Sequence, residues 1–445
     1  MNQVVMVPFP GRGHINPMLN LCNLLSSRVN EPNRTTVFTV VLTEEWLGLI
    51  NPDLKQANVR FATIPNVLPS ELHRGSNMIA FLTAVCTKME LPFEEVLDQM
   101  EIPVELIIAD AHMYWPFDVA NKRNIPVTAY WPLSASMFSV IHHADLLESH
   151  HHLGVDVSER GKECIDYIPG VSAFTVADIP EILHVGILKD ITSDLLVVTQ
   201  KANSLLLSTI YDLESDAIDV LKSRLKIPIF TAGPNIPLSS QINSINPQPI
   251  YINWLDSKPP RTVLYVSFGS FLPISDVELE EIVAGLRSSG VSFLWVARGK
   301  TADLKEMCGE EGMVVEWCDQ MAVLLHSSIG GFWTHCGWNS VKEGLFSGVP
   351  MLTLPIFLDQ PLNEKAIVED WKVGRKARTE MGGFKRRDEI AEVVRRFMDS
   401  ESVERIGMME RAEKLREICR DSVGDGGSAN EDLGAFIRDI VTIRK

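Results

Sequence analysis

Apolar and polar positions follow the same order twice along this chain: a short apolar run, a loop and an amphipathic stretch. The first copy opens with the apolar run "VVMV" at 4–7 and the glycine-bearing loop "PFPGRGHI". Apolar residues then recur at helical spacing over 16–29, and Asn16 and Pro17 suit the first turn of a helix. Another apolar run occupies 35–43. The pattern predicts a strand, a loop, a helix beginning at Asn16 and a second strand.

The second copy predicts strands over 262–268 and 291–298, with a helix over 275–290 between them. Ser275 and Glu278 have the spacing of a capping box at the start of that helix. Strand–helix–strand units of this kind build parallel sheets that are covered by helices. We therefore expect an α/β protein with two doubly wound domains.

A stretch that is rich in Pro, Ser, Asn and Gln and poor in charge separates the two copies, at 232–250. It predicts one domain over 1–236, a linker over 237–250 and a second domain over 251–425. Open α/β sheets bind ligands beyond the carboxyl ends of their strands. The expected site is accordingly a cleft between the domains.

Composition narrows the class of protein. The 445 residues suffice for two or three domains, and 45% hydrophobic with 22% charged residues is typical of a globular protein. A formal charge of −17 argues against a nucleic-acid partner. The seven Cys are scattered without a C-x-x-C pair, which disfavours a disulfide framework and a zinc cluster. With no secretory signal and no apolar run of about 18 residues, we expect a cytoplasmic protein without a membrane span.

Two titratable residues near predicted strand ends are candidates for catalysis. The stretch 11–16, "GRGHIN", is only part of a dinucleotide fingerprint, because Asn16 stands where the third glycine belongs. His14 is either a general base or a loop histidine bonded to backbone. Asp110 ends a buried apolar run and either caps a helix or orients His14. The five His between 142 and 152 lack the polar partners of a metal site, so we expect a solvated helix end or loop there.

The stretch "HCGWNSVKE" at 335–343 follows the apolar run 329–334 and predicts a turn between a strand and a short helix. A metal is disfavoured, because one adjacent His–Cys pair supplies the only good ligands and neighbouring side chains at a strand end point apart. Two interpretations stay open. One is a diphosphate site at the helix N-terminus; the other is an ordinary helix in which Ser340 and Glu343 form a capping box.

From 317 to 360 the chain reads "WCDQMAVLLHSSIGGFWTHCGWNSVKEGLFSGVPMLTLPIFLDQ". This stretch resembles the 44-residue signature of plant secondary-product glycosyltransferases, the family 1 enzymes that use UDP-sugars. "PGRGHINPM" near the start, "SFGS" at 267–270 and "GGSA" at 426–429 extend the resemblance over the whole chain. It implies the GT-B fold, with two Rossmann-like domains facing across a cleft, and a C-terminal helix within 426–445 that packs back on the first domain.

The resemblance also implies roles for individual residues. In the first domain, His14 corresponds to the catalytic base and Asp110 to its partner. In the second, Trp317 stacks on uracil, Glu343 binds the ribose hydroxyls, and Gln360 is typical of members that use glucose. The other residues implied to contact the UDP-sugar are Ser270, Cys318, Asp319, Gln320, His335, Gly337, Trp338, Asn339, Ser340 and Asp359.

The activity that the resemblance implies is an inverting transfer of a hexose, with UDP-glucose and a small lipophilic acceptor as partners. A hydroxyl or carboxyl group of the acceptor would become a β-glycoside. The expected enzyme is a monomer that uses no metal or other cofactor, because the helix N-terminus and His335 stabilise the leaving diphosphate. The chain departs from the family pattern at "WCDQ", where many relatives have "WAPQ". It also has Pro132 where some relatives have a sugar-contacting Thr, so that contact is not carried over.

Two other functions fit some of these residues: a nucleotide-sugar epimerase of related fold, and a non-catalytic protein that binds UDP-sugar or a small molecule. The complete signature argues against the epimerase. Retention of both His14 and Asp110 argues against a protein that only binds. The acceptor class stays open among phenols, alcohols and carboxylic acids, including flavonoids, terpenoids and hormones.

Overall fold

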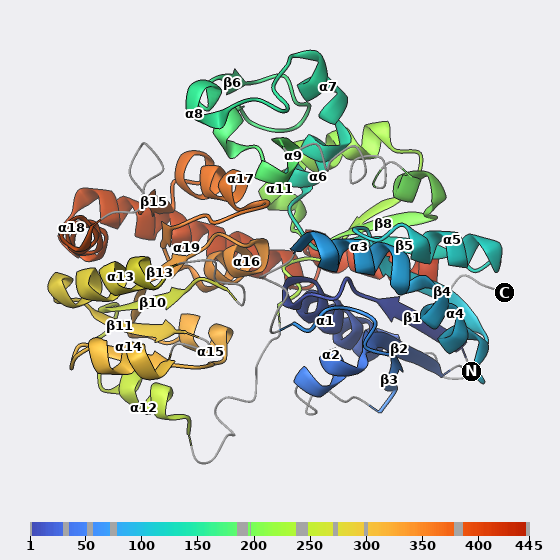
Figure 1. The fold of residues 1–445 in the computed structure, drawn as a ribbon, viewed down its shortest axis with the longest axis horizontal. Helices are drawn as coiled ribbons and strands as arrows, with labels where there is room; N and C mark the ends of the chain where they lie inside the picture. The colour runs from blue at the N-terminus through green and yellow to red at the C-terminus, as the bar shows by residue number, and fades with distance from the viewer. Residues whose placement is uncertain are drawn as a thin grey trace. The chain divides into compact units, whose positions relative to one another are not determined.

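The chain folds into two compact units (Figure 1), each built on its own parallel sheet. Unit 1 comprises Met1–Val176, Ile182–Ile236 and Asp421–Lys445, and unit 2 comprises Ala177–Glu181 and Pro237–Arg420. The computed structural model describes residues 2–29, 35–50, 57–71, 78–184, 195, 197–236, 248–269, 275–297, 301–377 and 386–441. Most of the predicted linker, 237–247, and the predicted donor contact Ser270 lie outside the described residues.

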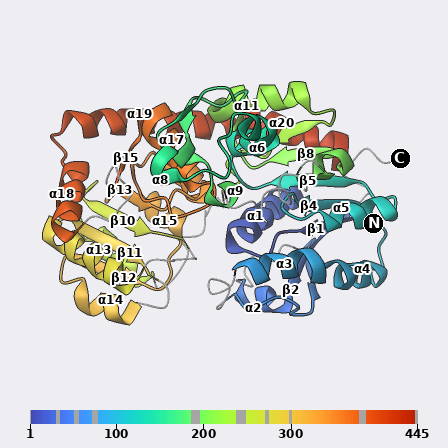
Figure 2. The ribbon, with the colours of Figure 1, turned by 45° about the horizontal axis from the view of Figure 1, so that its top comes forward.

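In the described residues, the sheet of unit 1 has seven parallel strands in the order β3-β2-β1-β4-β5-β8-β9. The order grows outward from β1 to β3 and then resumes at β4 on the other side of β1, which is the doubly wound arrangement. Helices lie along both faces of the sheet (Figure 2). The strands are β1 (Asn2–Val7), β2 (Thr36–Thr43), β3 (Val59–Ile64), β4 (Val104–Asp110), β5 (Val127–Trp131), β8 (Ser204–Leu207) and β9 (Ile229–Thr231).

One hydrophobic core of unit 1 gathers side chains from the sheet and from helices α1 (Arg12–Arg28) and α20 (Ser428–Phe436). It includes Val4 and Met6 of β1 and Leu433 and Phe436 of α20. The ring of Phe436 meets that of Phe230 edge-on, with centroids 5.5 Å apart. The helices of unit 1 and its margins are α1 (Arg12–Arg28), α2 (Glu44–Leu49), α3 (Met78–Lys88), α4 (Glu90–Asp98), α5 (Trp115–Lys122), α6 (Ala135–His142), α7 (Ala144–Ser149), α8 (Val157–Arg160), α9 (Glu181–His184), α11 (Tyr211–Arg224) and α20 (Ser428–Phe436).

Helix α1 begins at Arg12, so the predicted start at Asn16 is wrong. Gly11 takes the N-cap position in an extended conformation, and its carbonyl accepts bonds from the amides of His14 and Ile15 at 2.9 and 2.8 Å. Pro17 therefore lies inside the helix, where it removes one backbone hydrogen bond. The consequence for function is that His14 sits in the first helical turn, not in the preceding loop.

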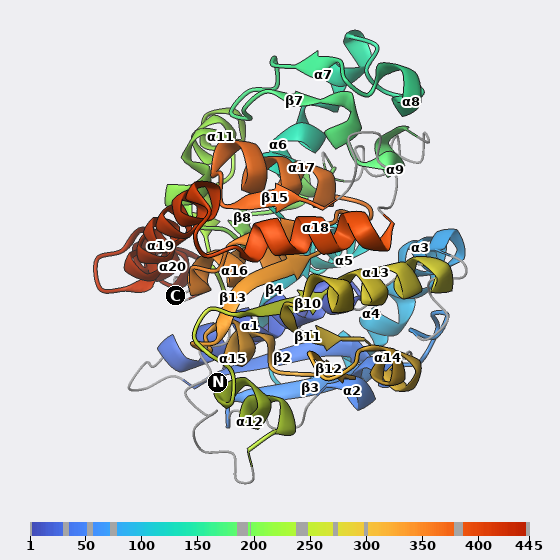
Figure 3. The ribbon, with the colours of Figure 1, turned by 90° about the vertical axis from the view of Figure 1, so that its left-hand side faces the viewer.

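In the described residues, the sheet of unit 2 has six parallel strands in the order β12-β11-β10-β13-β14-β15. Helices α13 and α18 lie side by side along it (Figure 3). The strands are β10 (Val263–Ser267), β11 (Ser292–Val296), β12 (Gly312–Val315), β13 (Ile329–Thr334), β14 (Met351–Thr353) and β15 (Gly374–Lys376). The helices are α12 (Ile250–Asp256), α13 (Asp276–Ser289), α14 (Thr301–Met307), α15 (Gln320–Leu324), α16 (Trp338–Ser347), α17 (Gln360–Lys365), α18 (Arg387–Met398) and α19 (Val403–Val423).

The prediction for α13 is confirmed in detail. Ser275 caps the helix, and the reciprocal bonds with Glu278 complete a capping box. Gly290 ends it with φ 71°, in the left-handed region that glycine enters without strain. Its apolar face packs into the core of unit 2 through Leu279, Ile282, Val283 and Leu286.

The histidine-rich stretch is only partly solvated. His150 and His151 are exposed, as expected. His143 is buried instead, and its Nδ1 lies 2.9 Å from the carbonyl oxygen of Ser139 one turn earlier. Among the helices of the described chain, none has the length and apolar character needed to cross a membrane.

Candidate functional site

His14 and Asp110 meet because β1 and β4 are neighbouring parallel strands. Val7 at the end of β1 pairs with Ala109, so the first turn of α1 and the end of β4 share one edge of the sheet. The Nδ1 atom of His14 lies 2.8 Å from Oδ2 of Asp110. Asp110 is fully buried, whereas the His14 side chain keeps 19% exposure. The helix-cap interpretation of Asp110 is wrong, since α5 begins only at Trp115.

The electrostatics keep Asp110 ionised. Burial alone would raise its pKa, but the charge of His14 and hydrogen bonds from two histidines outweigh burial and hold the pKa well below its ordinary value. An ionised carboxylate can only accept hydrogen bonds. The Nδ1 atom of His14 therefore carries its proton, which leaves Nε2 of the neutral ring with a lone pair. This is the arrangement of a general base held in one tautomer by its carboxylate.

The second histidine on this carboxylate, His112, was missed by the sequence analysis. Its Nδ1 lies 2.9 Å from Oδ1 of Asp110, and its backbone amide donates to the same oxygen at 3.0 Å. The Asp-x-His spacing was the available signal. The three side chains carry potential ligand atoms within 4.8 Å of one another. Both imidazoles bond to this carboxylate through Nδ1, so the three side chains form one hydrogen-bonded group.

Aromatic rings surround the pair in unit 1. Phe9 lies 4.9 Å from His14 and 5.9 Å from Phe81 between ring centroids, and His112 stacks on Trp131 at 4.6 Å. These rings give the His14–Asp110 pair a largely apolar setting, in which charge interactions are stronger than in water.

In unit 2 the stretch 335–337 is the turn between β13 and α16. Helix α16 begins at Trp338 with Gly337 as its N-cap, so the predicted capping box of Ser340 and Glu343 is wrong: both residues lie inside the helix. The N-cap residue Gly337 has no side chain that could cap the helix. Backbone amides at a helix start favour an anion, so the turn retains the phosphate interpretation.

His335 is enclosed by two glycines of this turn region. A Cβ atom on Gly337 would lie 2.5 Å from its Nε2, and one on Gly269 would lie 2.8 Å away. Burial lowers the pKa of His335 to about 4, against a smaller opposite effect of a hydrogen bond with the Ser267 backbone. The imidazole is therefore neutral near pH 7. Its Nδ1 is buried and has no hydrogen-bond partner among the described residues.

Glu343 belongs to a hydrogen-bonded network beside the turn. The amide nitrogen of Gln320 donates to a carboxylate oxygen of Glu343 and, at 3.1 Å, to the hydroxyl of Ser340. The amide oxygen of Gln320 accepts from the hydroxyl of Tyr265 at 3.0 Å. Burial raises the pKa of Glu343 to about 7, and the bond from Gln320 partly offsets that rise. The predicted donor contacts Gln320, Ser340 and Glu343 are thus brought together.

The first three residues of the signature have different surroundings: the ring of Trp317 is exposed, whereas the side chains of Cys318 and Asp319 make contacts within the fold. Trp317 is 58% exposed, as a platform for a stacked base requires. Cys318 is buried beside the hydroxyl of Tyr265, 3.4 Å away. Asp319 caps α15 by accepting from the amide of Ala322 at 3.0 Å. Cys318 and Asp319, the two residues at which this chain departs from the family's "WAPQ", therefore make contacts within the fold.

Asp359 and Gln360 are both 5% exposed. Asp359 accepts from the amide of Asn363 at 2.7 Å, and the side-chain oxygen of Gln360 accepts from the backbone amides of Ile356 and Phe357 at 2.7 and 3.1 Å. These bonds fix the two side chains at the start of α17.

Two further predicted contacts, Trp338 and Asn339, form the first turn of α16. The ring of Trp338 is 2% exposed and lies 6.4 Å from that of Trp371. It packs into unit 2, so the indole presents little surface to a sugar. Asn339 is partly exposed at the start of the helix.

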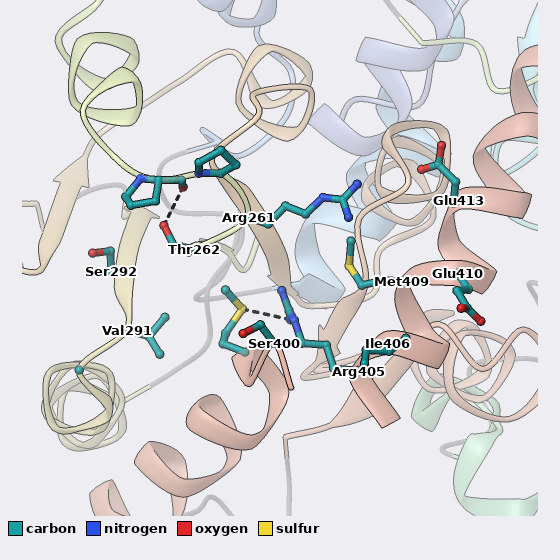
Figure 4. A pocket seen from close by; sticks show the side chains of 14 residues that line it. Arg261, Thr262, Val291, Ser292, Ser400, Arg405, Ile406, Met409, Glu410 and Glu413 are labelled. Atoms are coloured by element: carbon teal, nitrogen blue, oxygen red, sulfur yellow. Dashed lines mark hydrogen bonds between the residues drawn. The ribbon is translucent and has the colours of Figure 1, made fainter. Parts of the chain in front are cut away.

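A groove of about 890 Å³ lies elsewhere in unit 2, at the amino-terminal edge of its sheet (Figure 4). Arg261 precedes β10 and Val291 precedes β11, whereas the 335–337 turn follows the carboxyl end of β13. Arg405 on its wall donates to the carbonyls of Phe397 and Gly330 at 2.6 and 2.9 Å, which ties α19 to the sheet. The groove is therefore separate from the predicted donor contacts.

The chain is similar in sequence to known proteins. Residues 225–411 match the family described as UDP-glucoronosyl and UDP-glucosyl transferase. The chain is 48% identical to UDP-glycosyltransferase 87A1 of Arabidopsis thaliana, over 98% of this chain and 100% of that protein. It is also 48% identical to UDP-glycosyltransferase 87A2 of the same plant, over 98% and 96% of the two chains.

Solved structures share the fold. Medicago truncatula UGT71G1 complexed with UDP-glucose superposes with a TM-score of 0.82 and 25% identity, covering 99% of this chain and 98% of that one. Phytolacca americana UGT2, complexed with UDP-2fluoro-glucose and pterostilbene, superposes with a TM-score of 0.81 and 24% sequence identity. The match covers 99% of both chains. The two sheets are thus the Rossmann-like halves of a GT-B fold. By its sequence relatives and its fold, the chain belongs to the plant family 1 UDP-glycosyltransferases.

Proposed function

We propose that the chain transfers glucose from UDP-glucose to a hydroxyl or carboxyl group of a small lipophilic acceptor, with inversion at the anomeric carbon. The observation that carries the proposal is the 2.8 Å bond between His14 and the buried carboxylate of Asp110, which leaves Nε2 of a partly exposed imidazole to accept a proton. Glucose as the donor sugar is supported by Gln360 and by the UDP-glucose in the Medicago truncatula relative.

In the proposed reaction, Nε2 of His14 removes the proton of the acceptor hydroxyl. The acceptor oxygen forms a bond to the anomeric carbon while the bond from that carbon to the diphosphate oxygen breaks. The electron pair of the broken bond leaves with UDP, and the α-linked donor becomes a β-glycoside. Asp110 stabilises the imidazolium that forms, as in other base–carboxylate pairs.

The leaving diphosphate is assigned to the start of α16. Because His335 is neutral near pH 7, it offers no full positive charge, and the backbone amides of the turn carry most of the stabilisation. Trp317 supplies a stacking surface for uracil, and Glu343 accepts bonds from the ribose hydroxyls. Gln360 retains an amide nitrogen without a partner among the described residues, and it donates to a glucose hydroxyl.

The test is an acceptor panel of phenols, alcohols and carboxylic acids, incubated with UDP-glucose and analysed by mass spectrometry. A product heavier by one hexose, with a β-anomeric coupling in its NMR spectrum, is expected. Epimerised donor without any such product would contradict the proposal, and so would donor binding without transfer or hydrolysis. An α-anomeric product would contradict the inverting mechanism alone.

A further inference from the structure

The carboxylate of Asp110 is shared by two imidazoles, one on each oxygen. His14 bonds to Oδ2 at 2.8 Å and His112 to Oδ1 at 2.9 Å, both through Nδ1. Since the ionised carboxylate only accepts, both rings carry the proton on Nδ1. The family comparison accounts for the first histidine of this group but leaves the second without a role.

His112 is held firmly in this position. Its ring stacks on Trp131 with an interplanar angle of 8°, and Trp131 is itself 1% exposed and bonded to the carbonyl of Ser134 at 2.8 Å. On other sides its ring meets the rings of His14 and Phe9 edge-on, at 4.8 and 6.2 Å. A donor fixed by packing prevents Asp110 from rotating away from His14.

We propose that His112 is a positioning residue for the base: it holds Asp110 toward His14 and, by sharing the same carboxylate, lowers the pH at which His14 takes up a proton. The proposal rests on the proposed function insofar as His14 acts as the base. It assigns His112 no direct contact with the acceptor.

The charges around Asp110 set the direction in which His112 changes the protonation of His14. Each hydrogen bond donated to the carboxylate reduces the negative potential that stabilises a protonated His14. A positive charge on His112 would act in the same direction through repulsion. The backbone amide of His112 still donates to Oδ1 of Asp110 when the side chain is replaced, so the carboxylate stays beside His14. Removing the imidazole of His112 therefore makes His14 easier to protonate, and activity that needs neutral His14 is lost at a higher pH as the solution is acidified.

Among the described residues, few other titratable groups face this pair. Tyr130 of β5 is the register partner of Asp110 on the neighbouring strand, and burial raises the pKa of its hydroxyl well above the ordinary value, so it stays neutral. His142 of α6 lies one ring further away, beyond Phe138, and burial lowers its pKa. The loop after β1, helix α3 and strand β5 contribute the uncharged rings of Phe9, Phe81 and Trp131.

Three variants of the full chain test the proposal. His112→Phe keeps the ring stacked on Trp131 but removes the donor. His112→Asn places a neutral amide donor near the position of Nδ1. His150→Phe is the matched control, because His150 is an exposed histidine that stacks on Tyr167 with centroids 3.9 Å apart.

The first readout is the protonation of His14, followed by NMR of labelled histidine in the free protein, and it needs no acceptor. In His112→Phe the titration midpoint of His14 is expected to rise by about half a pH unit or more relative to wild type. The second readout is kcat/KM against pH. His112→Phe is expected to shift its acidic limb upward and to lower kcat by about 3–10-fold with little change in acceptor KM. His112→Asn should recover most of kcat.

An unchanged His14 midpoint in His112→Phe, with the protein folded, would overturn the proposal. Failure of His112→Asn to recover activity would contradict the holding role, and a shift in His150→Phe as large as in His112→Phe would contradict its specificity. If the NMR midpoint shifts as expected but wild type transfers no sugar, the role of His112 stands and the proposed function fails. The two ideas can thus be separated.

Discussion

His14 of unit 1 and His335 of unit 2 both lie just beyond the carboxyl end of a strand in a parallel sheet, yet the two imidazoles have different hydrogen-bond partners. His14 is partly exposed and bonded to the buried carboxylate of Asp110. His335 is enclosed between Gly269 and Gly337, and burial lowers its pKa to about 4. The comparison shows how the neighbouring groups set the chemistry of a histidine. A carboxylate partner holds the imidazole of His14 in the tautomer that a base requires, whereas burial without a charged partner keeps the imidazole of His335 neutral.

Replacing the carboxylate of Asp110 in unit 1 should have the largest effect on activity. Asp110→Asn can present an amide N–H to His14 and thereby favour the wrong tautomer. A loss of about 10²–10⁴-fold in kcat/KM is expected, with the pH profile altered. Steady-state kinetics measure this loss. The control is Asp98→Asn, because Asp98 forms a surface ion pair with Arg123. A loss no larger than that of the control would contradict the role of Asp110.

The corresponding change in unit 2 is Gly337→Ala. The added Cβ would lie 2.5 Å from Nε2 of His335, so the turn must shift. We expect the KM for UDP-glucose to rise about tenfold, with the acceptor KM little changed. The free energy of unfolding should fall by about 1–3 kcal/mol. Gly48→Ala is the control, since nothing lies within 4 Å of a Cβ there; equal donor KM values in the two variants would contradict the assignment of the turn.

A smaller effect is expected at the sugar. In Gln360→His, the side-chain oxygen that accepts from the amides of Ile356 and Phe357 is lost. We expect kcat/KM with UDP-glucose to fall by about fivefold relative to UDP-galactose. Parallel assays with the two donors measure the ratio, and an unchanged ratio would count against the assigned contact.

The smallest effect concerns the pH dependence of stability at Glu343. Its folded pKa of about 7 lies above the ordinary value of 4.5, so the protonated form is favoured on folding. That stabilisation is complete below about pH 4.5 and is lost as the pH rises through about 7. Glu343→Gln cannot ionise and does not lose this stabilisation. The Tm of the variant minus that of wild type should therefore increase between pH 5 and pH 8. The control is Glu401→Gln at an exposed position, for which the Tm difference from wild type should stay constant with pH. A constant difference in Glu343→Gln as well would contradict this prediction.

The sequence predicted the fold well where local signals agreed. The capping box of Ser275 and Glu278 and the apolar face of α13 appear as expected, because helical spacing and caps are local properties. It failed at Ser340 and Glu343, which have capping-box spacing but lie inside α16. Their bonds go to Gln320, 20 and 23 residues away in the chain, and local spacing carries no information on such a partner.

The site in unit 1 shows the same limit. The sequence suggested the pairing of His14 with Asp110, 96 residues apart, and the resemblance strengthened it. It did not indicate His112, because a second donor on the same carboxylate depends on how the turn after β4 orients a side chain. Nor did it indicate that the indole of Trp338 is buried, since that follows from its packing near Trp371.

The central claim is that the imidazole of His14 is the base and that of His335 is not. The His14→Ala variant tests this claim most directly. With an acceptor from the panel, kcat/KM should fall by about 10²–10⁴-fold. The dissociation constant of UDP-glucose, measured by calorimetry, should stay close to that of wild type, because the assigned donor contacts lie in unit 2. Transfer by His14→Ala at a rate near that of wild type would contradict the account.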